Sequence, residues 1–414
     1  MKKLNAFAVY LILSGASSMI MSMVFTVDLV YQISVVKLDP LQLVLVGTVL
    51  EGSAFLFEVP TGVVADVYSR RLSIIIGMFL IGAGFVLEGS VPLFAPILLA
   101  QVLWGLGYTF TSGATDAWIA DEVGEAGAGR AFLCGAQIAQ AGALVGIAAA
   151  VILGSIQINL PIVAGGGLFA GLGIFLILAM PENGFKPAPV TNRASWQSMT
   201  GTLRSSIRQM RGRPILITIL LIGAIGGASS ESFDRLWRKH ILDTFTLPAL
   251  GRFQPVVWFG IINVVAMLLT IGATEIVRRR LDTTSHLAVA RVLFASTALL
   301  MAGVVGFSLA GNFALALIGL WAVSVVRRVN EPVYTAWINQ HVEESSVRAT
   351  VLSMSSQSDA LGQIAGGPVL GAIGSASSAR VAIAIGGFLL SPALLLYART
   401  VRGRKASPAL PEEA

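Results

Sequence analysis

The sequence predicts an all-α membrane protein in which twelve transmembrane helices form two pseudo-symmetric bundles of six. The first observation behind this prediction is composition: 55% of the residues are hydrophobic and 12% are charged, against about 45–50% and about 25% in soluble domains. The second is that apolar residues gather in twelve long runs, and the third is that segments of the first half recur in the second. One core cannot hide this much apolar surface, so we expect it to face lipid.

The apolar runs have about the length of a bilayer-crossing helix, roughly 20 residues. They are 5–36, 40–64, 73–90, 94–121, 130–154, 160–180, 214–242, 252–277, 286–308, 313–340, 348–373 and 378–401. The one long polar stretch, 181–213, is interpreted as a linker with an amphipathic piece around 196–210. The predicted domains are therefore a first bundle over 1–180, the linker over 181–213, a second bundle over 214–401 and a tail over 402–414.

The placement of lysine and arginine predicts the orientation, because basic residues concentrate in cytoplasmic loops. With the N-terminus in the cytoplasm, the basic residues of outside loops are Lys37, Arg252 and Arg380, whereas the linker and the tail are rich in arginine. Both termini are therefore predicted to be cytoplasmic. A chain with one cysteine and no targeting segment fits the inner membrane of a bacterium.

The residue pattern argues against several classes of function. The single cysteine, Cys134, excludes a disulfide within the chain, and the three histidines lie far apart without metal-ligand spacing. The sequence has no phosphate-binding GxxxxGK[ST] loop and no pairing of a nucleophile with a base. We therefore expect no enzyme activity, no cofactor and no metal. The formal charge of +6 is interpreted as membrane topology and not as nucleic-acid binding.

The two halves of the chain share local patterns. The stretch DAWIADEVGEAGAGR (116–130) is similar to TAWINQHVEESSVR (335–348). Trp118 and Trp337 are equivalent in this repeat, and both are expected to anchor the membrane interface. A second match, an acidic residue followed by paired arginines, stands after the second and the eighth runs. Paired halves are typical of transporters, whose binding site lies near the midplane between them.

The stretch GVVADVYSRR, residues 62–71, resembles the loop motif G-x-L-x-D-R-x-G-R-R/K of the major facilitator superfamily. It matches at Gly62, Asp66, Arg70 and Arg71, and the resemblance covers nearly the whole chain. It implies a transporter of the major facilitator fold whose first, fourth, seventh and tenth helices line the cavity. It also implies a monomer that binds a small-molecule substrate and protons within the lipid bilayer.

The motif predicts a gate on the cytoplasmic side. An aspartate at position 66 can sit at the N-terminus of another helix, where unpaired N–H groups favour an anion by about 0.3–1 kcal/mol, or pair with a basic residue such as Arg130. These bonds would lock the two halves in one state and break in the other. A simpler alternative is that Arg70 and Arg71 only bind lipid headgroups. The predicted gate residues are Glu58, Gly62, Asp66, Arg70, Arg71, Asp116, Asp121 and Arg130.

A closer resemblance is to the proton-coupled drug-efflux branches of this superfamily, including the exporters of tetracycline and macrolides. It rests on the stretches LEGSAFLFEVPTGVVADVYSRR, SGATDAWIADEVG and SSESFDRLW (229–237). Gln101 stands where that branch has an arginine in the fourth helix. The fifth helix also lacks the proline of the antiporter pattern in GALVG (142–146).

Ionisable residues inside the predicted spans are candidate functional residues, because each is unfavourable by about 2.5–3.5 kcal/mol on insertion scales. Asp28 and Gln32 share one face of the first span, and Glu51 falls near the middle of the second. We interpret Asp28 and Glu51 as proton carriers. For Asp28 the alternative is an aspartate at the outer helix end that only touches water.

The seventh and tenth spans carry further charges. Four-residue spacing predicts the pairs Glu231–Arg235 and Asp234–Arg238 along the seventh span. In the tenth span, Arg327 and Arg328 precede Glu331 and are interpreted, with it, as part of the proton-coupling machinery, in which an arginine leaves a carboxylate upon protonation. The alternative is that these pairs only neutralise the wall of a water-filled cavity.

The function predicted is a proton-coupled antiporter that exports amphipathic drugs or metabolites by alternating access. The predicted substrate-cavity residues are Tyr31, Gln32, Gln101, Tyr108, Glu231, Asp234, Arg235, Asn330 and Tyr334. One alternative is a proton-coupled importer or uniporter of a small polar nutrient, which favours a cavity rich in Asn and Gln. Another is a transport-inactive membrane scaffold, which would not need charges buried within spans.

Overall fold

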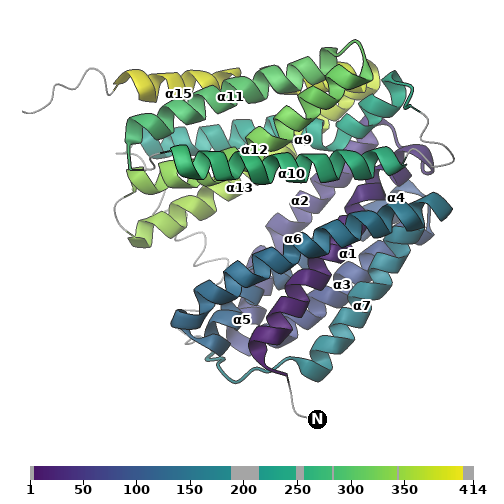
Figure 1. Ribbon diagram of the computed structural model, residues 1–414, viewed down its shortest axis with the longest axis vertical. Helices are drawn as coiled ribbons and strands as arrows, with labels where there is room; N and C mark the ends of the chain where they lie inside the picture. The colour runs from purple at the N-terminus through teal and green to yellow at the C-terminus, as the bar shows by residue number, and fades with distance from the viewer. Residues whose placement is uncertain (1–3, 188–213, 249–255, 282–283, 343–344, 404–414) are drawn as a thin grey trace, which may run out of the picture. The chain divides into compact units, whose positions relative to one another are not determined.

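A computed structural model describes residues 4–187, 214–248, 256–281, 284–342 and 345–403, and every regular element in these ranges is a helix (Figure 1). The described residues pack as two compact units, one within Met1–Arg204 and Leu247–Val264, the other within Ser205–Thr246 and Val265–Ala414. The predicted amphipathic piece at 196–210, Arg252 and most of the tail lie outside the described residues. The bundle boundaries drawn from the sequence stay a prediction.

The helices of the first unit follow the first six apolar runs. They are α1 (Ala6–Ser34), α2 (Pro40–Val63) with a π-helical extension η1 (Val64–Tyr68), α3 (Arg70–Ser90), α4 (Phe94–Thr111), α5 (Ala114–Val123), α6 (Glu125–Ile156) and α7 (Leu160–Ala179). The fourth run contains two helices because the chain turns at Gly113, whose φ of 71° favours glycine.

The remaining helices follow the last six runs. They are α9 (Pro214–Thr244), α10 (Val256–Arg280), α11 (His286–Leu309), α12 (Phe313–His341), α13 (Ser345–Ala376), α14 (Ala379–Phe388) and α15 (Ser391–Gly403). Among the described residues, 11 helical segments are long and apolar enough to cross a membrane. The remaining predicted segment, 348–373, is not among these 11, but it is helical as α13, with serine, glutamine and aspartate in its middle. The prediction of an all-helical membrane protein is confirmed.

Side chains in the sequence define several helix starts. Asp39 caps α2 by accepting a hydrogen bond from the N–H of Gln42, whose own side chain accepts from the N–H of Asp39, and Pro40 occupies the first helical position. Ser69 caps α3 by accepting from the N–H of Leu72 at 2.9 Å. These caps satisfy N–H groups that have no partner within the helix.

Glycines bring helices into close contact at equivalent places in the two units. In the first unit, a Cβ added to Gly146 of α6 would lie 2.0 Å from the carbonyl oxygen of Met19 of α1. In the second, a Cβ on Gly362 of α13 would lie 2.1 Å from the carbonyl oxygen of Ala224 of α9. Since these are the first and fifth predicted spans of each half, both units use small residues to pack the same pair of helices.

The two tryptophans of the internal repeat lie in the cores of their units. Trp118 is 1% exposed and Trp337 is 0% exposed. The prediction that they anchor the membrane interface is therefore wrong: both rings pack against apolar side chains. Trp118 also donates its indole N–H to the carbonyl oxygen of Pro181 at 2.8 Å, so its polar group needs no water.

Candidate functional site

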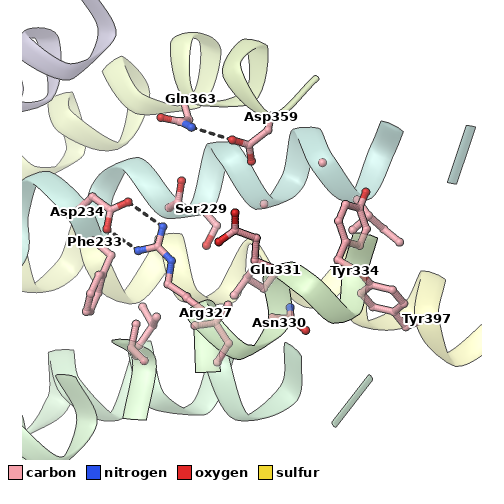
Figure 2. Close-up of a pocket in the computed structure, with 18 residues that line it drawn as sticks. Ser229, Phe233, Asp234, Arg327, Asn330, Glu331, Tyr334, Asp359, Gln363 and Tyr397 are labelled. Carbon is pink, nitrogen blue, oxygen red and sulfur yellow. Dashed lines mark hydrogen bonds and ion pairs between the residues drawn. The ribbon is translucent and has the colours of Figure 1, made fainter. Parts of the chain in front are cut away.

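The second unit contains a cavity of about 290 Å³ (Figure 2). Residues from α9, α11, α12, α13 and α15 line it, together with Leu390 from the turn before α15. The polar and charged side chains of its wall are Ser229, Ser230, Asp234, Arg327, Asn330, Glu331, Tyr334, Asp359, Gln363 and Tyr397.

An ion pair in the wall of this cavity joins α9 to α12. The guanidinium of Arg327 donates two hydrogen bonds to Asp234, one to each carboxylate oxygen, and the bond from Nη2 to Oδ2 measures 2.8 Å (Figure 2). This two-pronged geometry is the strong form of an arginine–carboxylate contact. The side chains are 33% and 44% exposed, so a ligand or water in the cavity can reach both.

The pairs predicted from local spacing form only in part. Glu231 and Arg235 pair along α9 at 3.1 Å, as predicted. Asp234 was expected to pair with Arg238 one turn later, but it binds Arg327 of another helix, and the Arg238 guanidinium lies over the Trp237 ring at 4.4 Å. Glu231 and Arg235 lie outside the lining of the described cavity.

Glu331 stands one turn after Arg327 on the same face of α12, and Figure 2 shows its carboxylate between Arg327 and Tyr334. Within the described part of the chain, no ion pair joins Glu331 to Arg327 or Arg328. The predicted pairing within α12 is therefore replaced by the contact with Asp234. Arg328 is exposed and does not line the cavity.

The other polar groups of the wall are held by neighbours. Asp359 accepts a hydrogen bond from Gln363 at 2.8 Å. The Asn330 side-chain oxygen accepts from the hydroxyl of Ser296 at 2.7 Å. Tyr334 donates its hydroxyl to the carbonyl oxygen of Ile219 at 2.9 Å. Sequence reasoning missed Gln363 as a cavity residue, because the sequence does not show which face of α13 meets α9 and α12.

In the first unit, the predicted cavity residues Gln32 and Gln101 bind a carboxylate that sequence reasoning missed. Glu88 of α3 accepts from Gln32 of α1 at 2.6 Å and from Gln101 of α4 at 3.1 Å. All three side chains are buried, with exposures of 2%, 1% and 3% in the order Glu88, Gln32 and Gln101. Each amide donates to a different oxygen of the carboxylate, so both oxygens are used.

The remaining predicted residues of α1, α2 and α4 differ in burial. Asp28 and Tyr31 are buried in α1, Glu51 is half-buried in α2 and Tyr108 is exposed on α4. The Asp28 carboxylate accepts a hydrogen bond from the N–H of Leu29 at 2.5 Å. The roles of these residues in proton or substrate binding stay predictions.

Three of the predicted gate residues, Arg70, Arg71 and Asp121, make contacts at the end of the first unit where α3 starts. Arg70 binds the carbonyl oxygen of Ala117 at 2.8 Å and forms an ion pair with Asp121. Arg71 donates to the carbonyl oxygen of Ile177 at 2.6 Å. Both arginines therefore make specific protein contacts, which the lipid-headgroup interpretation does not require.

A carboxylate that the sequence analysis did not name lies at the N-terminus of α3. Glu182 accepts a hydrogen bond from the N–H of Arg71 at 2.9 Å and from the Ser69 hydroxyl at 2.7 Å. Asp66 is exposed, and in the described part of the chain its carboxylate has no hydrogen bond or ion pair. The carboxylate at the N-terminus of α3 is therefore Glu182, which the sequence analysis missed because it follows the sixth span.

Four further predicted gate residues form no ion pair and no side-chain hydrogen bond in the described part of the chain. Arg130 is exposed, with its guanidinium 5.9 Å from the ring centre of Phe7. Glu58 and Asp116 are exposed. A Cβ on Gly62 would meet no atom within 4 Å, so Gly62 makes no close helix contact inside the first unit. Their part in a gate between the halves stays a prediction.

Comparisons with known proteins agree with this architecture. Residues 6–344 match the family model described as Major Facilitator Superfamily. The uncharacterized MFS-type transporter YxaM of Bacillus subtilis (strain 168) is 24% identical over 367 residues, which are 86% of this chain and 87% of that protein.

Two solved structures show the same fold at low sequence identity. The nucleoside transporter NupG superposes with a TM-score of 0.73 at 15% identity, over 96% of this chain and 100% of that one. The peptide transporter POT in complex with sulfate superposes with a TM-score of 0.71 at 16% identity, over 96% of this chain and 95% of that one. With a family model matched along most of its length, this chain belongs to the major facilitator superfamily and is a secondary transporter, not an enzyme.

Proposed function

We propose that this chain exports amphipathic organic molecules, drugs or metabolites, in exchange for protons by alternating access. The observation that carries the proposal is the ion pair of Asp234 with Arg327 in the cavity wall. An ion pair that is open to the cavity can be broken by a proton on the carboxylate or by a charged ligand. Both events therefore act on one contact between α9 and α12.

The lining of the cavity supports a substrate that carries positive charge. It contains three carboxylates, on Asp234, Glu331 and Asp359, and one guanidinium, on Arg327. When all four are ionised, the wall has an excess of negative charge, which favours a cationic group. The remaining wall includes apolar side chains such as Phe233, which suit the hydrophobic part of an amphipathic molecule.

Competition at Asp234 gives a mechanism for exchange. A proton on Asp234 removes the charge that holds Arg327, and a cationic substrate competes with Arg327 for the same carboxylate. Proton and substrate then bind in alternation, as antiport requires. Glu331, one turn along α12, can accept the Arg327 guanidinium when it leaves Asp234. Each exchange of partners biases the helices between two arrangements.

The proposal is tested in everted membrane vesicles from a bacterial host that lacks its own efflux pumps. A fluorescent amine reports the pH gradient while cationic, neutral and anionic amphipathic compounds are added in turn. Cationic compounds should dissipate the gradient with the unchanged chain and fail to do so with Asp234→Asn or Arg327→Gln. Arg380→Gln removes an exposed arginine of α14 and should behave as the unchanged chain. Equal responses to all three classes, or full exchange by both ion-pair variants, would refute the proposal.

A second candidate is a proton-coupled importer or uniporter of a small polar nutrient. Asn330 and Gln363 in the cavity wall favour it, because carboxamides bind neutral polar groups. Transport assays in whole cells separate the candidates: an importer accumulates its substrate inside, and a uniporter moves it without disturbing the pH gradient. A scaffold without transport activity moves none of the compounds.

We also propose a monomer in the inner membrane of a bacterium, with both termini in the cytoplasm. The arginines at 278–280, directly at the end of α10, support this orientation. A reporter that is active only outside the cytoplasm, fused to the C-terminus, should be inactive. An active fusion would reverse the proposed orientation.

A further inference from the structure

A buried carboxylate of the first unit plays no part in the cavity described above. Glu88 lies two residues before the end of α3 at Ser90 and is 2% exposed. Its two oxygens accept from Gln32 Nε2 at 2.6 Å and from Gln101 Nε2 at 3.1 Å. Since a buried ionisable group in a membrane-spanning helix is unfavourable, its presence at a polar cluster of three helices calls for a function.

The amide oxygen of Gln32 is the second observation. The Gln32 side chain is 1% exposed, and its Oε1 accepts no hydrogen bond within the part of the chain that the structure describes. An ionised Glu88 has no proton to give, so it cannot satisfy this oxygen. A protonated Glu88 has an O–H donor, and a half-turn of the Gln32 amide would bring Oε1 to it. The same three side chains can therefore hold either form of the carboxyl group.

We propose that Glu88 is a proton-binding site of the first unit. A proton from water adds to one carboxylate oxygen, Gln32 rotates its amide to accept the new O–H, and Gln101 keeps donating to the other oxygen. A carboxamide suits this role because it carries both a donor and an acceptor. The inference deepens the proposed function by naming where a coupling proton is held, and it rests on that function.

The surroundings of Glu88 contain few other titratable groups. On α1, Asp28 stands one turn before Gln32, and Tyr31 is adjacent in sequence; both side chains are buried. The helices α4 and α7, which pack against α3, contain no acidic or basic residue, and the tyrosine of α4, Tyr108, is exposed. The acidic residues of η1 and α5 pack at the opposite end of α3.

An aromatic cluster closes one side of the site. The rings of Phe25 and Trp104 lie 5.1 Å apart, and those of Phe85 and Trp104 lie 6.0 Å apart. Phe85 is three residues before Glu88 on α3, and Trp104 is three residues after Gln101 on the next helix, so the rings lie about one turn toward the end where α3 starts. A proton therefore reaches Glu88 from the side where α3 ends, which is predicted to be the outside.

The test measures protonation directly, without a transport substrate. Infrared difference spectra of the purified full-length chain in liposomes are recorded as the pH is lowered, and the C=O stretch of protonated carboxyl groups is followed. Glu88→Gln should lose one component of this band that the unchanged chain shows. Glu125→Gln removes an exposed carboxylate at the start of α6 and should keep that component.

Two further variants strengthen the test. Glu88→Asp keeps a carboxyl group on a shorter side chain and should shift the component, which covers the case that Glu88→Gln does not fold. Gln32→Leu should also shift it, because the carboxyl group loses a hydrogen-bond partner. Spectra that match the unchanged chain in both Glu88 variants would overturn the proposal. That outcome leaves the Asp234–Arg327 proposal standing, and failure of gradient-driven transport would not alter the infrared result.

Discussion

Glu182 accepts a hydrogen bond from the backbone N–H of Arg71 at 2.9 Å, which places a carboxylate at the N-terminus of α3. The Ser69 hydroxyl donates to the other oxygen of Glu182 while it caps α3 at the N–H of Leu72. Glu182, three residues after the end of α7 at Ala179, thus holds the first turn of α3. The anion that a helix N-terminus favours is provided here by a residue far along the chain.

Removing this carboxylate should destabilise the first unit. Glu182→Ala is expected to lower the free energy of unfolding by about 0.5–2 kcal/mol, the range for loss of a helix cap. Thermal unfolding in detergent, followed by tryptophan fluorescence, measures the change. Asp66→Ala is the matched control and should alter stability by less than about 0.5 kcal/mol, as for an exposed side chain. Equal destabilisation by the two variants would contradict the assignment of the helix-terminus acid to Glu182.

The tryptophans of the repeat offer an internal comparison. Trp118 donates its indole N–H to Pro181, whereas the indole N–H of Trp337 has no acceptor in the described residues. Trp118→Phe should therefore be more destabilising than Trp337→Phe by about 0.5–1.5 kcal/mol, the net contribution of one hydrogen bond. Both variants keep a large aromatic ring in the core, so the difference between their unfolding temperatures isolates the hydrogen bond. A greater loss with Trp337→Phe would refute this prediction.

The helix positions could be predicted because a helix that crosses a bilayer needs a long apolar run. The long apolar runs of this sequence are separated by charged, Pro-rich or Gly-rich breaks, so each run marks one span. The split of the fourth run at Gly113 could not be predicted, because nothing local separates this glycine from the other 43 of the chain's 44. In α13, the helix was predictable from the length of its mainly apolar run, 348–373. The position of Asp359 in the cavity wall could not be predicted from the sequence, because it depends on how α13 packs against the other helices.

The candidate sites depended on contacts that sequence spacing does not show. Local spacing predicted Glu231–Arg235 but also paired Asp234 with Arg238, whereas the partner of Asp234 stands 93 residues away. Glu88 has no charged residue or amide side chain within four positions on either side, and its partner Gln32 is 56 residues away. The residue types showed which charged side chains could have a function. Which partner each of them binds is determined by helix packing, which the sequence does not show.

Reversing the ion pair of the cavity should separate its electrostatic and structural roles. Asp234→Asn alone and Arg327→Gln alone should each destabilise the second unit by about 1 kcal/mol, because the two side chains are partly exposed and their attraction is partly screened. The double variant Asp234→Arg with Arg327→Asp restores the attraction and should recover most of the stability in thermal unfolding. A double variant less stable than the sum of both single changes would show that the pair's orientation, and not its charge, stabilises the unit.

The contact between α1 and α6 depends on the absence of a side chain at Gly146. A Cβ there would lie 2.0 Å from the carbonyl oxygen of Met19, so Gly146→Ala forces the two backbones apart. The loss of packing along the helices is expected to destabilise the first unit by about 1–3 kcal/mol, the range for overpacking. The measurement is again the unfolding temperature in detergent.

Gly171 provides the control for this substitution, because a Cβ on it would meet no atom within 4 Å. Gly171→Ala on α7 should leave stability unchanged or raise it by up to about 1 kcal/mol, since alanine favours the helix more than glycine does. The opposite signs of the two changes would show that space between helices decides the effect of alanine at each site, and not helix propensity. If Gly146→Ala were as stable as Gly171→Ala, the tight approach of α1 and α6 would not exist in the folded chain.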